Sequence, residues 1–575
     1  MRKLTGLPAG SGIALGSAFI FSRGILHVER QHVDNVNLEF EKLEFALEHA
    51  EVDLKDLAER TRKEVGRDES KIFEAQITIM RDPELQKKVR DLVKEQEVNI
   101  GFAWQDAVRF FAETLRKVDD EYLAARAADV EEVGQRVLAL LLGQPLHLRK
   151  PETPSIILAD ELTPADTILI DRATVLAFCT QGGGPTSHVA ILSKAQDIPC
   201  VVGLGEELGT IEDGTFLIVD GNKGEILIDP DIPTRKDYES KAYSQLNLQR
   251  AAIKNASFPA ETLDRKRVEV VANVGSYQDA VKALEYGAEG IGLLRTEFLY
   301  LEREVLPDEE EQYLAYSAIL EAFGMLPVVL RTSDIGGDKE LPYLDLAKER
   351  NPFLGVRGLR LALVHPDKLL KPQLRAALRA GRGHDLRIMF PMVAALTEIR
   401  QARKVMEECM AELIKEGKPI STNFQLGIMV EVPSAALMAD ILSPEIDFFS
   451  IGTNDLTQYT LAADRTNSQL AYLTSGFSPA VLRLIQNVIV QAHKYGKWVG
   501  LCGELAGEPL AIPILLGLGL DEFSMNPTAI PKAKQIIREL KIPECKKLAE
   551  NILKFESAEE VKAYVREKMS KFASY

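Results

Sequence analysis

Two arginines, Arg295 and Arg331, each lie at the end of a short apolar run in the second half of the chain. A guanidinium group binds phosphate or carboxylate oxygens through two parallel hydrogen bonds. Two such groups arriving from separate strands therefore predict a site for a small anion. Arg465, within Ala462–Thr466, is a candidate third member of this site.

Two carboxylates occupy similar positions. Glu431 ends one apolar run, and Asp455 follows Asn454 at the end of another. Mg²⁺ is typically held by one or two carboxylates and completes its shell with water and substrate oxygens. The pair beside the arginines predicts a magnesium site that binds a doubly anionic metabolite. The alternative is that each carboxylate only pairs with an arginine.

Cys502 ends a further apolar run, in Gly500–Glu504. A thiol at such a position can give or take a proton when its surroundings tune its pKa. A free cysteine also serves as a small buried packing residue. The position at a strand end favours the role in proton transfer.

The first half carries a glycine-rich segment, Gly182–Ile191, that leads into a helix-forming run with His188 near its start. The exposed N–H groups of a first helical turn favour negative charge. A neutral imidazole is a competent nucleophile near pH 7, so His188 is a candidate acceptor for a phosphoryl group. The alternatives are a capped helix with an incidental histidine, and a metal ligand, for which no second histidine or cysteine lies at ligand spacing.

The elements that position these residues form an alternating pattern in the second half, in which apolar strand-like runs are separated by helical stretches. The predicted strands are Val268–Val274, Ile291–Arg295, Val328–Thr332, Ile388–Met392, Leu426–Glu431, Phe448–Asn454, Trp498–Cys502 and Glu522–Met525. Eight such alternations predict a (β/α)8 barrel, whose active sites lie at the carboxyl ends of the strands.

The first half of the chain has a different pattern of predicted strands and helices. Short strands occur before residue 33 and after residue 145, and between them a long helix with apolar positions spaced by three and four begins near Val36. We therefore expect an α/β multidomain protein with a discontinuous α/β domain (1–32 and 146–232), an inserted all-helical subdomain (33–145), a linker helix (233–259) and the barrel (260–575).

The composition limits the function classes. The chain has 575 residues and a formal charge of −17, which argues against nucleic-acid binding because phosphate contacts demand a basic surface. No uncharged apolar run reaches the length of a membrane span. Five cysteines without metal-type spacing predict free thiols and a cytoplasmic protein.

These motifs together resemble enzyme I of the phosphoenolpyruvate-dependent sugar phosphotransferase system, over nearly the whole chain. The segments that carry the resemblance are Asp120–Val130, Thr186–His188, Gly287–Phe298, Asp334–Lys339, Asn351–Gly355, Phe449–Tyr459 and Cys502–Gly507. Long ordered matches of this kind are more specific than a single glycine-rich loop.

The resemblance implies a role for each candidate residue. His188 would be the phosphorylated histidine of the α/β domain, and Arg295, Arg331, Arg465 and the Asn454–Asp455 segment would bind phosphoenolpyruvate. Glu431 and Asp455 would hold Mg²⁺, and Cys502 would protonate the enolate of pyruvate. The implied partners are the histidine phosphocarrier protein HPr, docked on the helical subdomain, and a second copy of the chain, joined through the C-terminal domain.

Three positions depart from the family pattern: Pro185 replaces an arginine common before Thr-Ser-His, Gln76 replaces a histidine, and Val356 replaces a tryptophan.

Three other functions are alternatives to that of enzyme I. A pyruvate phosphate dikinase or phosphoenolpyruvate synthase would need a nucleotide-binding domain for which the chain has no room. A non-catalytic phosphorelay scaffold would not need the retained chemical groups, and a barrel lyase or aldolase would leave His188 unused.

Overall fold

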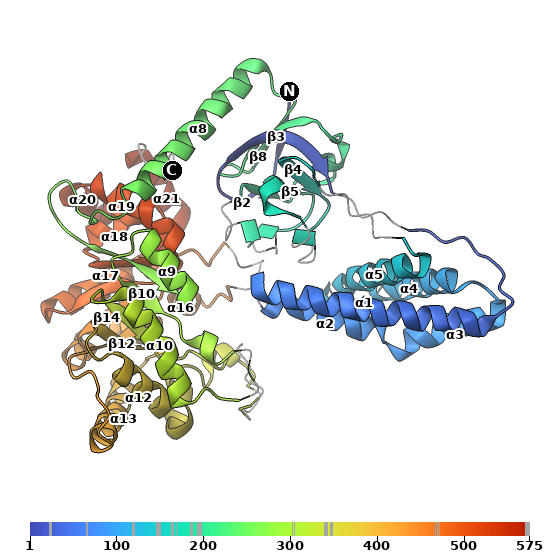
Figure 1. Cartoon of the computed structure of the whole chain (residues 1–575). Coiled ribbons are helices and arrows are strands. Elements are labelled where there is room, and N and C mark those ends of the chain that lie inside the picture. Colours follow the sequence, from blue (N-terminus) through green and yellow to red (C-terminus); the bar gives the residue numbers. More distant parts are fainter. Residues whose placement is uncertain are drawn as a thin grey trace. The chain divides into compact units, whose positions relative to one another are not determined.

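The computed structural model describes most of the chain and divides it into two compact units, Met1–Leu246 and Asn247–Tyr575 (Figure 1). The residues that the structure describes are 1–21, 26–64, 67–117, 121–144, 151–162, 166–167, 170–184, 187, 189–190, 192–193, 198–301, 303, 305–337, 343–344, 349–465, 467, 470 and 472–569. Within these residues, no helix combines the length and apolar character that crossing a membrane would require.

The first unit contains an eight-stranded mixed sheet with the strand order β1-β8-β7-β3-β4-β5-β6-β2. Its strands are β1 (Arg2–Thr5), β2 (Leu7–Gly10), β3 (Ile13–Ile20), β4 (Ser155–Ala159), β5 (Val175–Thr180), β6 (Cys200–Val202), β7 (Phe216–Asp220) and β8 (Glu225–Ile228). The central strands β3, β4, β5 and β6 run parallel, and the predicted hairpin is the antiparallel pair β7–β8. Strands from both ends of this unit therefore meet in one sheet.

Strand β4 is apolar from Ile156 to Ala159 because both faces of the sheet are covered there. Ile156 and Leu158 of β4 belong to one buried cluster, whereas Ile157 and Ala159 belong to another. Alternate residues of a strand point to opposite faces, so a strand buried on both sides is expected to read as a continuous apolar run.

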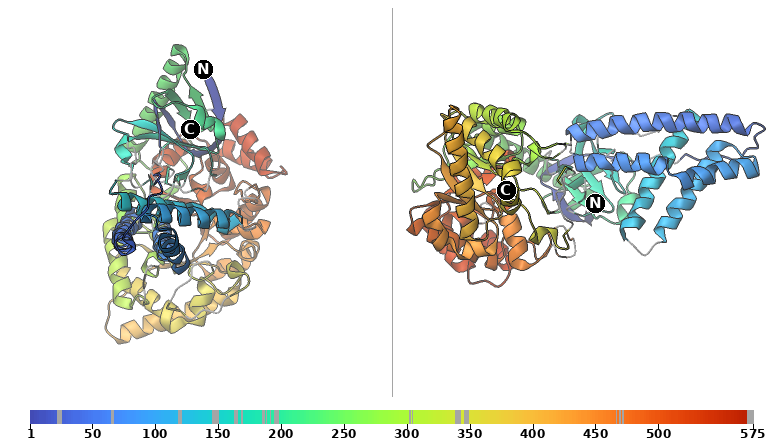
Figure 2. Two further views of the ribbon diagram at one scale, coloured as in Figure 1. Left: turned by 90° about the vertical axis from the view of Figure 1, so that its right-hand side faces the viewer. Right: turned by 90° about the horizontal axis from the view of Figure 1, so that it is seen from below.

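The chain between β3 and β4 forms helices that lie side by side (Figure 2, blue). They are α1 (Val36–Glu64), α2 (Arg67–Met80), α3 (Pro83–Gln96), α4 (Ile100–Arg116) and α5 (Glu121–Leu142). The apolar positions of α1, predicted from their spacing of three and four residues, are confirmed as its buried face, since Leu43, Leu47, Ala50 and Leu54 are fully buried. Their core includes Trp104 of α4. Helix α8 (Ile232–Lys254) then spans the boundary between the two units.

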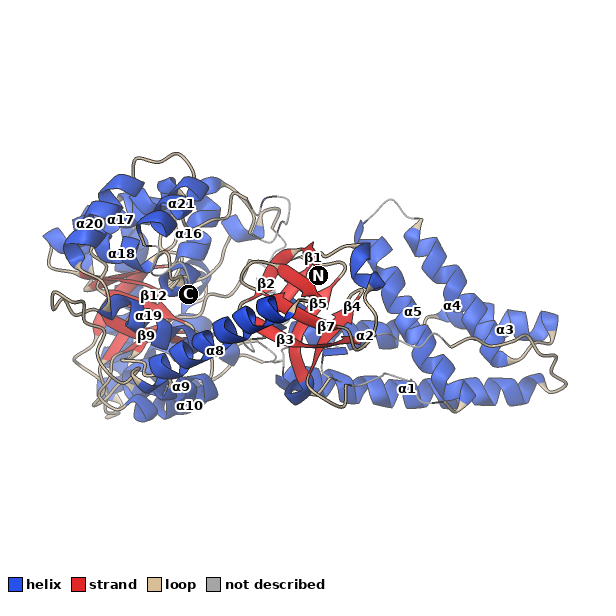
Figure 3. Cartoon of the chain, turned by 90° about the horizontal axis from the view of Figure 1, so that it is seen from above, coloured by secondary structure: helices blue, strands red, loops and turns tan. Residues whose placement is uncertain are grey.

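The second unit is a closed barrel of eight parallel strands surrounded by helices, as the alternating pattern predicted (Figure 3). The strands are β9 (Glu269–Val274), β10 (Ile291–Leu294), β11 (Val328–Arg331), β12 (Leu386–Phe390), β13 (Gln425–Val430), β14 (Phe448–Ile451), β15 (Trp498–Leu501) and β16 (Glu522–Met525). The longer helices around them are α9 (Tyr277–Glu285), α10 (Glu309–Phe323), α12 (Lys371–Ala380), α13 (Leu396–Lys415), α16 (Thr453–Leu461), α17 (Pro479–Lys494), α19 (Ile530–Arg538), α20 (Ile542–Ile552) and α21 (Ala558–Lys568). Shorter helices are α11 (Leu359–Val364), α14 (Pro433–Leu437), α15 (Ala439–Leu442) and α18 (Ile512–Leu518).

Two predicted strands extend two or more residues beyond the ends that the structure shows. The strand predicted to reach Asn454 ends at Ile451, and the strand predicted to reach Met392 ends at Phe390. In the first case Thr453 already begins α16. In the second, Met392 takes a positive φ of 56°, which breaks the extended backbone. The strand ends are hard to predict because buried residues follow them, Met392 and Val393 after β12 and Thr453 after β14.

Candidate active site

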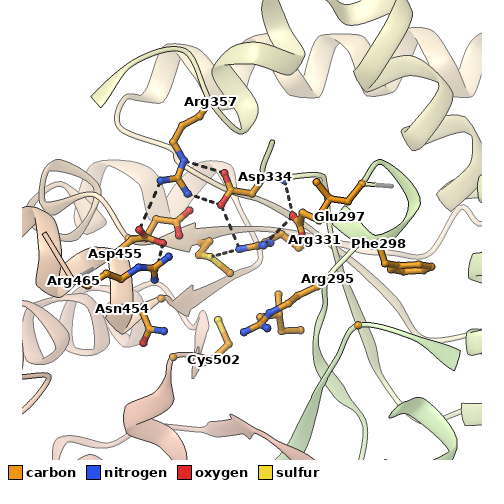
Figure 4. A pocket seen from close by; sticks show the side chains of 17 residues that line it. Arg295, Glu297, Phe298, Arg331, Asp334, Arg357, Asn454, Asp455, Arg465 and Cys502 are labelled. Atoms are coloured by element: carbon orange, nitrogen blue, oxygen red, sulfur yellow. Dashed lines mark hydrogen bonds and ion pairs between the residues drawn. The ribbon is translucent and has the colours of Figure 1, made fainter. Parts of the chain in front are cut away.

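A cavity of about 580 Å³ opens at the carboxyl ends of the barrel strands (Figure 4). Its wall carries charged and polar side chains from segments that follow five strands, β10, β11, β13, β14 and β15. The residues that line it are Gly275, Leu293, Arg295, Glu297, Phe298, Leu301, Arg331, Asp334, Arg357, Met429, Glu431, Gly452, Asn454, Asp455, Arg465, Cys502 and Gly503.

The structure brings all the candidate residues of the barrel to this one cavity. Arg331 is the last residue of β11, and Arg295, Glu431 and Cys502 each follow directly on a strand. Asn454 and Asp455 lie in the first turn of α16 rather than on a strand, and Arg465 lies just beyond the end of that helix.

Arg331 is fixed by acidic neighbours on the floor of the cavity. Its Nη2 donates to Glu297 Oε1 at 2.9 Å, and its Nη1 lies 3.8 Å from Asp334 Oδ2 and 3.4 Å from Met429 Sδ. Burial opposes the charge of Arg331, but Glu297, Asp334 and Glu431 outweigh it and raise the pKa of the guanidinium. Arg331 is therefore a permanent cation held in one orientation.

Arg357 is a buried arginine of the cavity that was not among the predicted site residues. Its Nε and Nη2 donate to the two carboxylate oxygens of Asp334 at 3.2 and 2.8 Å, and its Nη1 lies 3.8 Å from Asp455 Oδ1. Tyr459 accepts a further hydrogen bond at 3.3 Å. Burial lowers the pKa of Arg357, but Asp334 and Asp455 raise it more, so the pKa lies above its usual value.

Arg295 and Arg465 are more open. Arg465 Nη1 lies 4.0 Å from Asp455 Oδ2, and more than a third of its side chain is exposed. Arg295 exposes part of its side chain to the cavity, and protein surrounds the rest, so that loss of hydration and the nearby Arg331 lower its pKa. Two guanidinium groups can thus reach a ligand, while Arg331 and Arg357 are bound to Glu297 and Asp334 (Figure 4).

Glu431 and Asp455 carry the features expected of ligands for a hard cation. Glu431 is 1% exposed, and burial, Asp334 and Asp455 raise its pKa to about 8. Its Oε1 accepts the Met392 N–H at 2.6 Å. Asp455 Oδ1 is buried and accepts no hydrogen bond. Neighbouring buried carboxylates with an unsatisfied oxygen fit a divalent cation, which supplies the missing charge and completes its shell with water or substrate oxygens. Among the described residues, no group of three or more His, Cys, Asp or Glu could hold a metal alone.

Cys502 is 4% exposed, and its Sγ donates to Ile451 O at 3.7 Å. Burial raises the pKa of the thiol to about 11, although Ser450 and Arg331 act in the opposite direction. The group is therefore a thiol at neutral pH. Such a group can give a proton to a ligand, whereas the thiolate needed for nucleophilic attack is scarce.

Asn454 is held by a reciprocal pair of hydrogen bonds with Glu504. The Asn454 amide nitrogen donates to Glu504 Oε1 at 3.3 Å, and the Glu504 N–H donates to Asn454 Oδ1 at 3.2 Å. This pair joins the start of α16 to the segment that follows Cys502. Asp455, the candidate metal ligand next to Asn454, is therefore held at a fixed position relative to Cys502, which lies two residues before Glu504.

Comparison with known proteins agrees with this chemistry. Residues 249–542 match the phosphoenolpyruvate-binding domain of phosphoenolpyruvate-utilising enzymes, 151–224 match their mobile domain, and 5–126 match their N-terminal domain. Phosphoenolpyruvate-protein phosphotransferase from Priestia megaterium is 46% identical to this chain, covering 98% of this chain and 99% of the relative. The chain belongs to the phosphoenolpyruvate-protein phosphotransferase family.

Two further relatives with the same name are similar over nearly their full length. The protein from Bacillus subtilis (strain 168) is 44% identical over 99% of this chain and 100% of its own. The protein from Staphylococcus carnosus (strain TM300) is 43% identical over 98% of this chain and 99% of its own. This member of the phosphotransferase family is thus an enzyme of phosphoenolpyruvate-dependent phosphoryl transfer.

His188 of this phosphotransferase, like Pro185, lies outside the described residues. The predicted placement of His188 in a first helical turn is therefore not described. The backbone before it turns at Gly183, which has a φ of 86°, and the Ser187 N–H donates to Gly184 O at 2.9 Å. Gln76 of α2 is 1% exposed, so its side chain can influence a partner only indirectly.

Sequence reasoning did not single out Glu297, Asp334 or Arg357 as site residues. Glu297 and Asp334 had a usable signal, because each stands two or three positions after an arginine at a strand end. Arg357 had none. It lies in the irregular segment before α11, far in sequence from any strand end, and reaches the cavity through tertiary packing.

Proposed function

We propose that the protein transfers the phosphoryl group of phosphoenolpyruvate to its own His188, releases pyruvate, and passes the phosphoryl group to the histidine phosphocarrier HPr. This would be the first step of a sugar phosphotransferase system. The observation that carries the proposal is one cavity that combines four guanidinium groups, four buried carboxylates and a protonated thiol.

In this proposal Arg295 and Arg465 bind the oxygens of phosphoenolpyruvate, together with the free side of the Asn454 amide. Arg331 and Arg357 add positive charge that Glu297 and Asp334 hold in a fixed orientation. Phosphoryl transfer gains most of its rate from positioning and from charge stabilisation around the transferring group. A rigid set of arginines supplies both, since it does not have to reorganise during the reaction.

We further propose Mg²⁺ as the cofactor, held by Glu431 and Asp455. When bound, the ion would neutralise charge on the carboxylate and phosphoryl oxygens of the substrate. Glu431 would have to lose its proton to act as a ligand. Its elevated pKa near 8 then makes the binding of the cation dependent on pH, with tighter binding as the pH rises.

Cys502 is the proposed acid. As the bond from phosphorus to the substrate oxygen breaks and the bond to the His188 nitrogen forms, the electron pair remains on the enolate of pyruvate. The Sγ–H of Cys502 then protonates C3 of the enolate, and solvent returns a proton to the thiolate. The raised pKa of the thiol keeps the proton in place until the enolate, a stronger base, has formed.

The domain roles complete the proposal. Residues 1–32 and 146–232 would carry the phosphohistidine, residues 33–145 would dock HPr, and the linker at 233–259 would let His188 move between the barrel and the helices. The barrel region, 260–575, would bind the substrate and form a homodimer. All five cysteines are buried and none forms a disulfide, which supports a reducing, cytoplasmic location.

The test is transfer of labelled phosphate from phosphoenolpyruvate to the purified full-length protein, with and without Mg²⁺. We expect acid-labile, base-stable label that requires Mg²⁺ and disappears in His188→Ala. Absence of label on folded wild-type protein would refute the proposal. Label that persists in His188→Ala would refute the assignment of the acceptor.

A further inference from the structure

Asn273 is a polar residue of the barrel interior for which the reaction as described has no use. It lies on β9 and is partly buried, and it is not among the residues that line the cavity. Its Nδ2 donates to the backbone carbonyl of Cys502 at 2.9 Å. Strand β16 lies between β9 and β15 in the barrel, so this hydrogen bond links β9 to the end of β15 across the strand between them.

The orientation of the Asn273 amide is fixed by Ser524 of β16. The Ser524 hydroxyl donates to Asn273 Oδ1 at 2.6 Å. A backbone carbonyl only accepts hydrogen bonds, so the nitrogen of the amide must face Cys502 and the oxygen must face the serine. Ser524 is fully buried and cannot exchange this bond for one with water.

We propose that Asn273, oriented by Ser524, is a positioning residue for Cys502. The inference rests on the proposed role of Cys502 as the acid. The N–H of Cys502 donates to Ile451 O at 3.0 Å, and its carbonyl is held by Asn273. These two bonds fix the peptide planes on both sides of the Cys502 Cα, and the planes together set the direction of the Cα–Cβ bond that carries the thiol.

Gly503, the residue after Cys502, further restricts the backbone at Cys502. A Cβ on Gly503 would come within 1.9 Å of Thr453 Oγ1, so the backbone after Cys502 packs directly against the start of α16. The backbone around Cys502 is thus held in one conformation, and a carbonyl that moves carries the Cβ and the thiol with it. Loss of the Asn273 bond should shift the thiol relative to C3 of the substrate without altering the arginines or carboxylates, which Asn273 does not contact.

The test separates proton delivery from phosphoryl transfer. Phosphoenolpyruvate labelled stereospecifically at C3 with deuterium is turned over once in tritiated water by an excess of full-length protein with Mg²⁺. The pyruvate is reduced at once to lactate, and the configuration of its chiral methyl group is determined. The yield and rate of phosphoprotein formation are measured in the same mixture. A correctly placed acid delivers its proton to one face of the enolate, whereas solvent is less selective.

We expect wild type to yield one methyl configuration. Asn273→Ala should yield a mixture and slow pyruvate release about tenfold, as expected for loss of one buried hydrogen bond, while phosphoprotein formation changes less than about twofold. Ser524→Ala should change the configuration in the same direction by a smaller amount, and it carries the test if Asn273→Ala does not fold. The matched control is Asn487→Ala, which removes an amide-to-carbonyl bond of 2.8 Å to Ala436 on the outer helices.

Cys502→Ala distinguishes the two levels of the proposal. If this variant still yields a single configuration, the proposed role of Cys502 itself fails. If Cys502→Ala yields a mixture while both Asn273→Ala and Ser524→Ala retain the wild-type configuration, only the positioning role is overturned. Equal loss of configuration in Asn487→Ala would show a general structural effect and would also overturn it.

Discussion

Glu431→Gln should make the metal-free barrel more stable while it removes a proposed ligand. In the absence of a cation, Glu431 is buried beside Asp334 and Asp455, and its pKa rises from 4.5 to about 8. A carboxyl group whose pKa is raised by folding binds more protons in the folded state than in the unfolded state between these two values. The stability of the folded barrel therefore falls as the pH rises through this window.

The size of the effect follows from that window. One pKa unit corresponds to about 1.4 kcal/mol, so Glu431 should cost the barrel about 3 kcal/mol at pH 7 and almost nothing near pH 4.5. Glutamine has the same shape, keeps a carbonyl oxygen for the Met392 N–H, and does not titrate. We expect Glu431→Gln to lie within about 1 kcal/mol of wild type near pH 5 and to exceed its free energy of unfolding by about 4 kcal/mol near pH 8.

The two tryptophans make this measurable in the intact protein. Trp104 lies in the helical part and Trp498 begins β15, so a Trp104→Phe background leaves Trp498 as the reporter of barrel unfolding. Urea unfolding with a chelator would be followed from pH 5 to pH 9, with Glu407→Gln, an exposed change on α13, as the matched control. A gain that does not grow with pH, or a variant less stable than wild type throughout, would refute the reasoning.

Three other changes test separate parts of the structure. Arg357→Lys removes the bidentate hydrogen bonds to Asp334 and should lower the rate of phosphoprotein formation about 100-fold. The control is Arg360→Lys, because Arg360 contacts Glu398 through one nitrogen only, and it should have little effect. Equal effects of the two changes would contradict the prediction. Gly503→Ala forces the start of α16, with the proposed metal ligand Asp455, away from the backbone after Cys502, and should lower the rate of phosphoprotein formation about 100-fold. Gly507→Ala makes only ordinary contacts and should have little effect; a fully active Gly503→Ala enzyme would show that the backbone can move without disturbing the site. Lys534 is fully buried, and its ammonium group donates to the carbonyls of Ala256, Phe258 and Gly287. Lys534→Met should lower the free energy of unfolding of the barrel by about 3 kcal/mol, measured by Trp498 fluorescence. A variant as stable as the control Lys546→Met, a change of an exposed lysine, would refute this prediction.

The barrel could be predicted from sequence because each strand is a short apolar run bounded by helical segments. The arginine, carboxylate and thiol candidates were found by the same route, since parallel strands in a barrel deliver their last residues to one face. The end of β14, predicted at Asn454 and observed at Ile451, could not be found from the same pattern. Gly452 and Thr453 are buried like the strand before them, so the pattern of hydrophobicity does not reveal where α16 begins.

Arg357 and Asn273 could not be found in this way, for different physical reasons. Arg357 reaches the cavity from an irregular segment, and its place is set by the carboxylate of Asp334 rather than by any periodic pattern. Asn273 is the next-to-last residue of a strand-like run, where a single polar residue gives no information about its partners. Its bonds to Ser524 and Cys502 connect positions 251 and 229 residues apart in sequence.

The most direct test of the proposed active site is equilibrium binding of phosphoenolpyruvate to His188→Ala, which cannot pass the phosphoryl group on. Calorimetry would compare binding with Mg²⁺ and with a chelator, and would repeat both in His188→Ala combined with Glu431→Gln or with Arg295→Ala. We predict binding that depends on Mg²⁺ and is lost in either double variant. Binding of equal strength without the cation, or unchanged in both double variants, would contradict the assignment of the barrel cavity as the site of the reaction.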